Sequence, residues 1–160
     1  MTDVAPALLA KHAFLHGLPA PQVAALARAT RQIWVPAGHR FFEEGGRAGQ
    51  LWLITAGHVA LDIQVPGRAR LIVETIGEGD VMGLSWVSAP QEWQFGAEAI
   101  QPTTAFELDT AALTALCESD PVLGYQITRR LIAVAVRRLQ ATRIRLLDLY
   151  SAPSQNPVAP

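Results

Sequence analysis

The sequence has almost no cysteine and little charge, and both shortages restrict the kind of protein it encodes. Cys117 is the single cysteine of 160 residues, which excludes an intrachain disulfide and a zinc or iron–sulfur site built from several cysteines. Only 17% of the residues are charged, against about 25% in ordinary soluble domains. Because half of the residues are apolar, we expect an apolar surface that serves as a subunit interface or a ligand groove.

Long hydrophobic runs and a strong net charge are also missing. No stretch reaches the ~18 apolar residues of a membrane span, and no basic stretch precedes an apolar run at the start of the chain. We therefore predict no membrane segment and no secretory signal. The formal net charge of −1 gives the chain as a whole no electrostatic reason to bind nucleic acid directly. The low cysteine content makes a reducing, cytoplasmic location the expectation.

The apolar residues divide the chain into three zones of different period. Residues 7–29 have a helical pattern that is interrupted at Gly17-Leu-Pro19, which predicts two short helices. Residues 31–108 hold eight short apolar runs separated by glycine turns, which predicts an antiparallel β-roll of the jelly-roll kind. Residues 111–150 are helical again.

These zones predict one mainly β domain with flanking helices over residues 1–150. The last ten residues, 151–160, are rich in proline and small polar residues and offer little to bury. We expect them to form a disordered tail.

The C-terminal zone contains one long predicted helix. A shorter helix runs through Cys117, and Ser119 or Asp120 then caps a helix that starts at Pro121 and reaches Tyr150. Residues at 3–4 spacing on this helix are all apolar or small, as a two-stranded coiled coil requires. This seam, which predicts a homodimer, consists of Tyr125, Thr128, Ile132, Ala135, Leu139, Thr142, Leu146 and Leu149.

A second apolar stripe on the same helix is expected to pack on the helix's own domain. It consists of Leu123, Ile127, Leu131, Val134 and Ala141. The alternative to a dimer is a monomer that buries one broad face of this helix. Arginines cover much of the remaining surface, and a solvated flank explains them better than a nucleic-acid-binding patch.

Several motifs occur in a specific order along the chain. They are Pro36-Ala-Gly38, Glu44-Gly45, the run from Leu51 to Val59, Gly79-Asp80, Gly83 and, on the long helix, the segment from Arg137 to Thr142. Over about residues 12–150 this order resembles the cyclic nucleotide-binding domain of the Crp/Fnr superfamily. The resemblance implies a β-roll with a C-terminal dimerisation helix and a cyclic nucleotide as ligand.

The chain departs from the family pattern at the positions that matter most for that ligand. Leu84 stands where the resemblance implies a glutamate for the ribose hydroxyl, and Trp93 or a neighbour stands where it implies an arginine for the cyclic phosphate. No Arg or Lys occurs anywhere from Leu71 to Thr128. A phosphate without its guanidinium loses a bidentate, charge-assisted pair, so the ligand is expected to be non-standard or absent.

Aromatic and small polar residues near these two positions suggest a pocket for a flat or apolar molecule. The candidate ligand-binding residues are Gly83, Leu84, Ser85, Trp86, Trp93, Gln94, Phe95, Thr142 and Arg143. In the alternative, Trp93 and Phe95 fill the vacated site as a collapsed core. Thr142 also belongs to the dimer seam, where packing is its simpler role, and Arg143 is equally compatible with a solvated position.

The sequence offers little support for catalysis or for a bound metal. No nucleophile motif, phosphate-binding loop or recognisable carboxylate pair occurs. His12 and His16 are spaced for chelation on a helix but lack a third ligand, and His58 and Cys117 are weakly supported as haem ligands. We therefore predict a protein that is not an enzyme and has no metal site.

The function predicted from these features is a stand-alone sensing or regulatory module. DNA-binding members of the family continue from the long helix into a helix-turn-helix, and such an element is not expected here because only a short tail follows Tyr150. We expect no fixed cofactor, with a cyclic nucleotide or another small molecule as ligand and a protein partner that reads the ligand state. The alternatives are a ligand-free dimeric scaffold that recruits a partner and, with less support, a metal- or haem-binding redox sensor.

Overall fold

The computed structural model describes residues 4–151, so the expected tail lies almost entirely outside the described residues. Its helical elements are α1 (Pro6–Leu9), the 3-10 turn η1 (Ala13–Leu15), α2 (Ala20–Arg28), the 3-10 turn η2 (Leu84–Val87), α3 (Thr110–Ser119) and α4 (Pro121–Ser151). Its strands are β1 (Thr30–Val35), β2 (Arg40–Phe42), β3 (Gln50–Ala56), β4 (Val59–Ile63), β5 (Leu71–Ile76), β6 (Val81–Met82), β7 (Gly96–Ala99) and β8 (Thr103–Asp109).

The eight strands form two antiparallel four-stranded sheets, which confirms the predicted β-roll. One sheet has the order β1-β8-β3-β6 and the other β2-β7-β4-β5. Apart from the β4–β5 hairpin, neighbouring strands are distant in sequence, so the roll closes through long-range pairs such as Val35 with Thr103 and Val59 with Ala99. The glycine turns of the sequence separate these strands as expected.

The N-terminal segment contains three short helical elements where two were predicted. A break after α1 turns the chain into η1, and the cause is His12, which leaves the helical conformation at φ −69° and ψ 132°. Its imidazole Nδ1 accepts a hydrogen bond from Phe14 N at 3.2 Å, which caps η1. The Gly17 interruption separates η1 from α2 as predicted.

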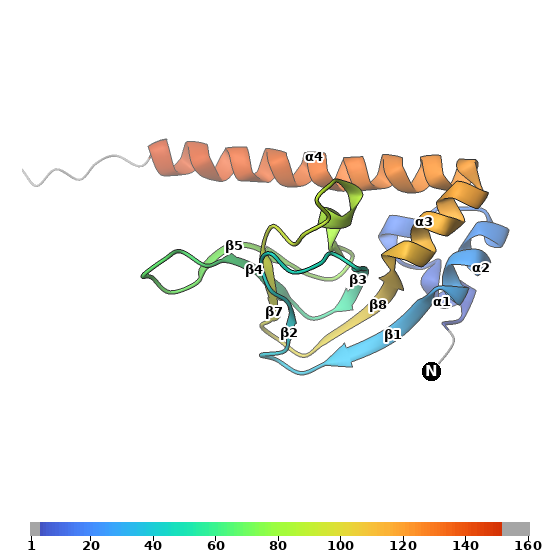
Figure 1. The fold of residues 1–160 in the computed structure, drawn as a ribbon, viewed down its shortest axis with the longest axis horizontal. Coiled ribbons are helices and arrows are strands. Elements are labelled where there is room, and N and C mark those ends of the chain that lie inside the picture. The colour runs from blue at the N-terminus through green and yellow to red at the C-terminus, as the bar shows by residue number, and fades with distance from the viewer. Residues whose placement is uncertain (1–3, 152–160) are drawn as a thin grey trace, which may run out of the picture.

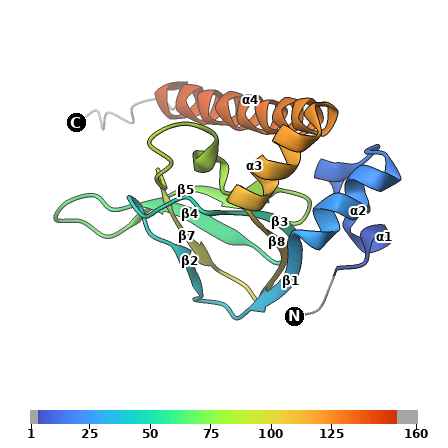
Figure 2. The same cartoon turned by 45° about the vertical axis from the view of Figure 1, so that its right-hand side comes forward.

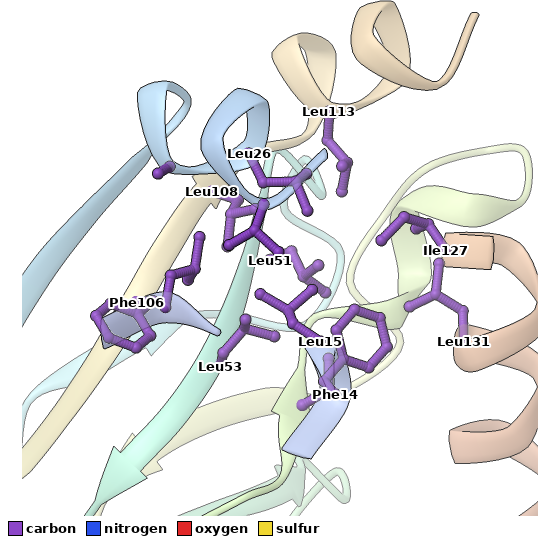
Figure 3. Close-up of a cluster of buried hydrophobic side chains, with 14 of the residues drawn as sticks. Phe14, Leu15, Leu26, Leu51, Leu53, Phe106, Leu108, Leu113, Ile127 and Leu131 are labelled. Carbon is purple, nitrogen blue, oxygen red and sulfur yellow. The ribbon is translucent and has the colours of Figure 1, made fainter. Parts of the chain in front are cut away.

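A buried cluster joins the N-terminal elements, the first sheet and the two C-terminal helices (Figure 3). It contains Phe14 and Leu15 of η1, Leu26 of α2, Leu51 and Leu53 of β3, Phe106 and Leu108 of β8, Leu113 of α3, and Ile127 and Leu131 of α4. Six elements of the chain thus share one core, and this core fixes the direction in which α4 leaves it.

Helix α4 is a single 31-residue helix that crosses the whole molecule (Figures 1 and 2). Its N-terminal half packs against α3 and the N-terminal elements, and its C-terminal half lies along the side of the roll that carries the β4–β5 hairpin (Figure 1). Leu123, Ile127, Leu131 and Val134 of the predicted inner stripe are buried, whereas Ala141 is exposed. The prediction was wrong for Ala141 because the buried core under α4 ends at Val134.

Beyond Val134 the helix is held to the roll mainly by arginines. Arg138 donates a hydrogen bond to the carbonyl of Val81, and Arg145 donates to the carbonyl of Val73 at 2.8 Å. Nearer the N-terminus of the helix, Arg130 donates to the carbonyl of Phe14 at 2.9 Å. Arginines expected to form a solvated flank therefore include three that dock the helix.

Candidate functional site

A cavity of about 280 Å³ lies between the roll and α4. Strand residues Phe42, Leu61 and Glu74 line it together with Gly83, Leu84, Ser85, Trp93 and Phe95 from the segment around η2, and Ala135, Arg138, Leu139 and Thr142 from α4. A pocket with mostly apolar walls and a few polar groups is the usual form of a small-molecule site.

A glycine turn brings η2 to this cavity. Gly83 follows β6 and adopts φ 97°, the left-handed region that other residues rarely occupy. A Cβ at this position would lie 2.7 Å from the carbonyl oxygen of Gln50 in β3, which is shorter than any ordinary contact. Only glycine therefore lets the chain pass so close to β3 and direct Leu84 and Ser85 toward the cavity.

Trp93 forms an aromatic wall of the cavity with Phe42. Its side chain is only 4% exposed, and its ring stacks on Phe42 with centroids 3.9 Å apart and planes 16° from parallel. Trp52 lies behind it at 5.8 Å between centroids. Backbone hydrogen bonds of 2.8 Å to Gly45 and Gly46 hold Trp93 in place. Trp93, one of the residues expected near the position where the resemblance implies an arginine, is thus a buried indole held by its neighbours.

The cavity nevertheless contains one cation, which comes from α4. Arg138 lines it from the helix side, mostly buried, with its Nε 3.6 Å from Oε1 of Glu74 on β5. Burial lowers the pKa of Arg138, and Glu74 partly opposes that effect. An arginine remains charged under any physiological condition, so the cavity holds a guanidinium beside a carboxylate.

Six of the nine predicted ligand-binding residues line this cavity. They are Gly83, Leu84, Ser85, Trp93, Phe95 and Thr142. The hydroxyl of Thr142 donates a hydrogen bond to the carbonyl of Arg138 at 2.9 Å, and its lone pairs can still accept a hydrogen bond from a ligand. These residues come from segments about fifty positions apart, which the docking of α4 brings together.

The other three predicted residues lie outside the cavity. Trp86 packs against both buried clusters of the domain, and no partner for its indole Nε1 occurs among residues 4–151. Gln94 is exposed and donates to the carbonyl of Glu92 at 3.2 Å. Arg143 is exposed on α4.

Sequence reasoning missed six lining residues, of which Arg138 and Glu74 matter most. The others are Phe42, Leu61, Ala135 and Leu139. Helical period contained a clue to Arg138, because it lies seven residues after the buried Leu131 and so belongs to the inner stripe. No pattern in the sequence indicated Glu74, because its place depends on how the β4–β5 hairpin docks under α4.

The histidines do not gather into a metal site. His12 is buried, and its Nε2 lies 3.0 Å from the carbonyl oxygen of Ile54, while His16 is exposed. Residues 4–151 contain no group of three or more His, Cys, Asp or Glu side chains placed to hold a metal ion. None of the helices in this range combines the length and hydrophobicity needed to cross a membrane.

All eight residues of the predicted seam are exposed in the single chain. Tyr125, Ile132, Leu139, Leu146 and Leu149 contribute large apolar side chains to this surface. They lie on a face of α4 adjacent to the one that docks on the roll, so the helix presents two apolar faces as predicted.

Known proteins resemble this chain in sequence and in fold. Over 142 residues it is 27% identical to the CRP-like cAMP-activated global transcriptional regulator of Mycobacterium tuberculosis. The match covers 89% of this chain but 62% of the relative, so the chain spans less than two thirds of that regulator's length.

Two crystal structures show the same fold at low identity. A cyclic nucleotide-binding protein of Geobacter metallireducens matches with a TM-score of 0.76 and 24% identity over 85% of this chain and 98% of its own. The catabolite activator protein of Thermus thermophilus matches with a TM-score of 0.68 and 24% identity over 86% of this chain and 63% of its own. The family model for the cyclic nucleotide-binding domain matches residues 32–120, more than half of the sequence, from β1 to the end of α3. The two antiparallel sheets, the cavity beneath the long helix and this match together show that the chain belongs to the cyclic nucleotide-binding domain family.

Proposed function

We propose that the protein is a non-enzymatic sensing module of the cytoplasm that binds a small molecule between its roll and α4. The observation that carries this proposal is the 280 Å³ cavity, of whose twelve lining residues eight come from the roll and the η2 segment and four from the long helix. A ligand in this place contacts both parts at once. It can therefore favour one position of the helix over another by binding one position more tightly.

The ligand in this proposal does not adopt the pose that the resemblance implies for cyclic nucleotides. No arginine occurs around Trp93, near the position where the resemblance implies the phosphate-binding arginine, and Leu84 cannot accept a hydrogen bond from a ribose hydroxyl. A phosphate placed against the indole would be desolvated without a paired charge, which costs several kcal/mol. The cation of the cavity lies instead on α4, in Arg138.

The output of the module, in this proposal, passes through a homodimer. The exposed seam on α4 has the 3–4 spacing of a coiled coil and lies beside the residues that line the cavity. Ala135, Leu139 and Thr142 belong to both sets, so a shift of the helix over a ligand changes the packing of the seam. A partner protein reads that change, without direct contact of this domain with nucleic acid or a membrane.

Calorimetric titration with cyclic AMP and cyclic GMP tests the ligand side of the proposal. We expect no heat of binding up to about 1 mM, a concentration that reveals binding free energies near −4 kcal/mol. Micromolar binding of either nucleotide would show that the Trp93 and Leu84 substitutions do not exclude the family's ligand.

A double variant tests whether the two substitutions are the cause. Trp93→Arg with Leu84→Glu restores the two groups that the resemblance implies, and we expect it to bind cyclic AMP while the unaltered protein does not. Leu84→Gln with Trp93→Phe is the matched control, because it changes size at the same positions without adding a charged pair. A folded double variant that stays inert would contradict an open, convertible pocket.

A ligand-free scaffold is the second candidate, and the packing of Trp93 favours it. The stack of Trp93 on Phe42 at 3.9 Å resembles a filled core more than a vacant site. Native mass spectrometry of protein purified from its own organism distinguishes the two candidates. A small molecule retained at one per chain supports the sensor, and its consistent absence together with an inert double variant supports the scaffold.

A further inference from the structure

The charged groups of the cavity restrict the chemistry of what it binds. Of the residues that line it, Glu74 and Arg138 are the ionisable ones, with opposite charges, so the cavity is neutral as a whole. The distance of 3.6 Å between Arg138 Nε and Glu74 Oε1 is too long for a hydrogen bond. The two groups attract each other, but they do not form a hydrogen bond with each other.

Both groups retain hydrogen-bonding capacity. Within residues 4–151, Arg138 spends one donor on the carbonyl of Val81, and a guanidinium has five. The carboxylate of Glu74 accepts no hydrogen bond from any group in this range. A donor edge and an acceptor edge thus lie side by side in a mostly apolar site. Neither group has a fully buried polar atom that lacks a partner in the described part of the chain, so both are accessible to a ligand.

The remaining walls favour a flat ring. Phe42 and the buried Trp93, stacked on each other, form an aromatic wall. Phe95 and the aliphatic side chains of Leu61, Leu84 and Leu139 line much of the rest. A volume of about 280 Å³ accommodates a fused two-ring molecule with modest substituents. Such rings gain contact area at a low cost in conformational entropy.

We propose that the cavity binds a neutral, planar heteroaromatic molecule that carries a cyclic amide, with its carbonyl toward Arg138 and its N–H toward Glu74. This inference rests on the proposed sensing function and names the class of its ligand. A cyclic amide has an acceptor next to a donor, so it can hydrogen-bond to both charged residues at once. Charge-assisted hydrogen bonds of this kind are about twice as strong as neutral ones.

Charged ligands fit this pair less well. An anion that approaches Arg138 also approaches the carboxylate of Glu74, which lies 3.6 Å away, and a cation that approaches Glu74 meets the guanidinium. At such distances in a partly dry site, like charges repel by several kcal/mol, which offsets the attraction to the other partner.

Three probes with the same fused-ring shape and different polar edges test this inference on the full chain. Isoquinolin-1(2H)-one is a neutral cyclic amide, 1-naphthoate is an anion, and isoquinoline has an acceptor alone. Ligand-observed nuclear magnetic resonance measures their affinities. We expect the cyclic amide to bind about tenfold or more tightly than the other two, as for a site that hydrogen-bonds both edges of its ligand.

The variant Glu74→Gln removes the negative charge but keeps the size of the side chain. We expect it to weaken the cyclic amide about tenfold and to strengthen 1-naphthoate, because the cavity then carries a net positive charge. Glu78→Gln is the matched control, since Glu78 is exposed in the turn before β6 and does not line this cavity. Thermal unfolding confirms that both variants are folded.

The possible outcomes separate this inference from the sensing function. Tighter binding of 1-naphthoate to the unaltered protein, or equal binding of all three probes without an effect of Glu74→Gln, overturns the ligand class and leaves a small-molecule site in place. Binding of none of the probes also overturns the class. Native mass spectrometry of the purified protein and the Trp93→Arg, Leu84→Glu double variant then test the sensing function.

Discussion

Individual buried polar side chains determine local structure that the hydrophobic pattern of the sequence does not predict. His12 is an example, because its ring joins the N-terminal segment to β3 through Ile54 and caps η1 through Phe14. Nδ1 accepts a hydrogen bond, so Nε2 carries the proton and the imidazole is neutral. Sequence spacing suggested a chelating pair with His16, whereas the structure gives His12 a role in holding the fold.

The pH dependence of stability tests this role of His12. Burial lowers the pKa of His12 below its ordinary value of 6.5. As the pH falls below about 6.5 the unfolded chain takes up a proton that the folded protein refuses, so stability decreases, by at most about 1.4 kcal/mol per pH unit. Stability from this residue is therefore present above pH 6.5 and is lost toward the lower pKa of the folded state.

Chemical denaturation between pH 7.5 and 5.5 provides the measurement. We expect His12→Gln to be less stable at pH 7.5 and to show a flatter decrease with pH than the unaltered protein. His16→Gln is the control, since His16 is exposed. An unchanged pH profile in His12→Gln would exclude His12 as the titrating group.

At the scale of elements, helix termini and strands were the most predictable features. Asp120 caps α4 as expected, because its Oδ1 accepts from the backbone N–H groups of Val122 and Leu123, each at 3.1 Å. Removal of this cap in Asp120→Ala should lower the free energy of unfolding by about 1–2 kcal/mol.

Asp120→Asn provides the comparison, because asparagine caps nearly as well as aspartate. Urea denaturation of both variants measures the difference in the free energy of unfolding. Equal loss of stability in the two variants would mean that the charge of Asp120, and not its cap, holds the start of α4.

The eight strands could be predicted because short apolar runs and glycine turns are local features of the sequence. The composition of the cavity could not be predicted to the same extent. The order of motifs along the chain predicted Leu84, Ser85 and Trp93 as lining residues. Glu74 and Arg138, in contrast, meet only because α4 docks over the β4–β5 hairpin. Tertiary docking of this kind depends on the shared core (Figure 3), which no single segment specifies.

At the scale of the whole molecule, the central question is whether α4 engages a second copy. Two exposed residues of the helix allow a direct test, because Leu146 belongs to the seam and Ile144 does not. Their exposed fractions are 49% and 60%. At ~100° per residue they lie on opposite sides of the helix, about 200° apart.

We expect Leu146→Asp to convert the proposed dimer to a monomer at tens of micromolar, because it places a charge in an apolar seam. Ile144→Asp introduces the same charge away from the seam and should leave the dimer intact. Light scattering coupled to size exclusion measures both. A monomeric unaltered protein, or equal effects of the two variants, would contradict dimerisation through this seam.

The length of α4 beyond its last buried residue has a mechanical consequence. From Val134 to Ser151 the helix continues as one rigid element along the roll (Figure 1). At 1.5 Å per residue this segment is about 25 Å long, so a swing of about 10° at Val134 displaces its tip by about 4 Å. In the proposed sensing module the helix would act as a lever whose fulcrum lies at the edge of the core, once the hydrogen bonds of Arg138 and Arg145 to the roll are broken. A change of less than 1 Å beside the fulcrum would then become a displacement at the tip that a partner protein could register.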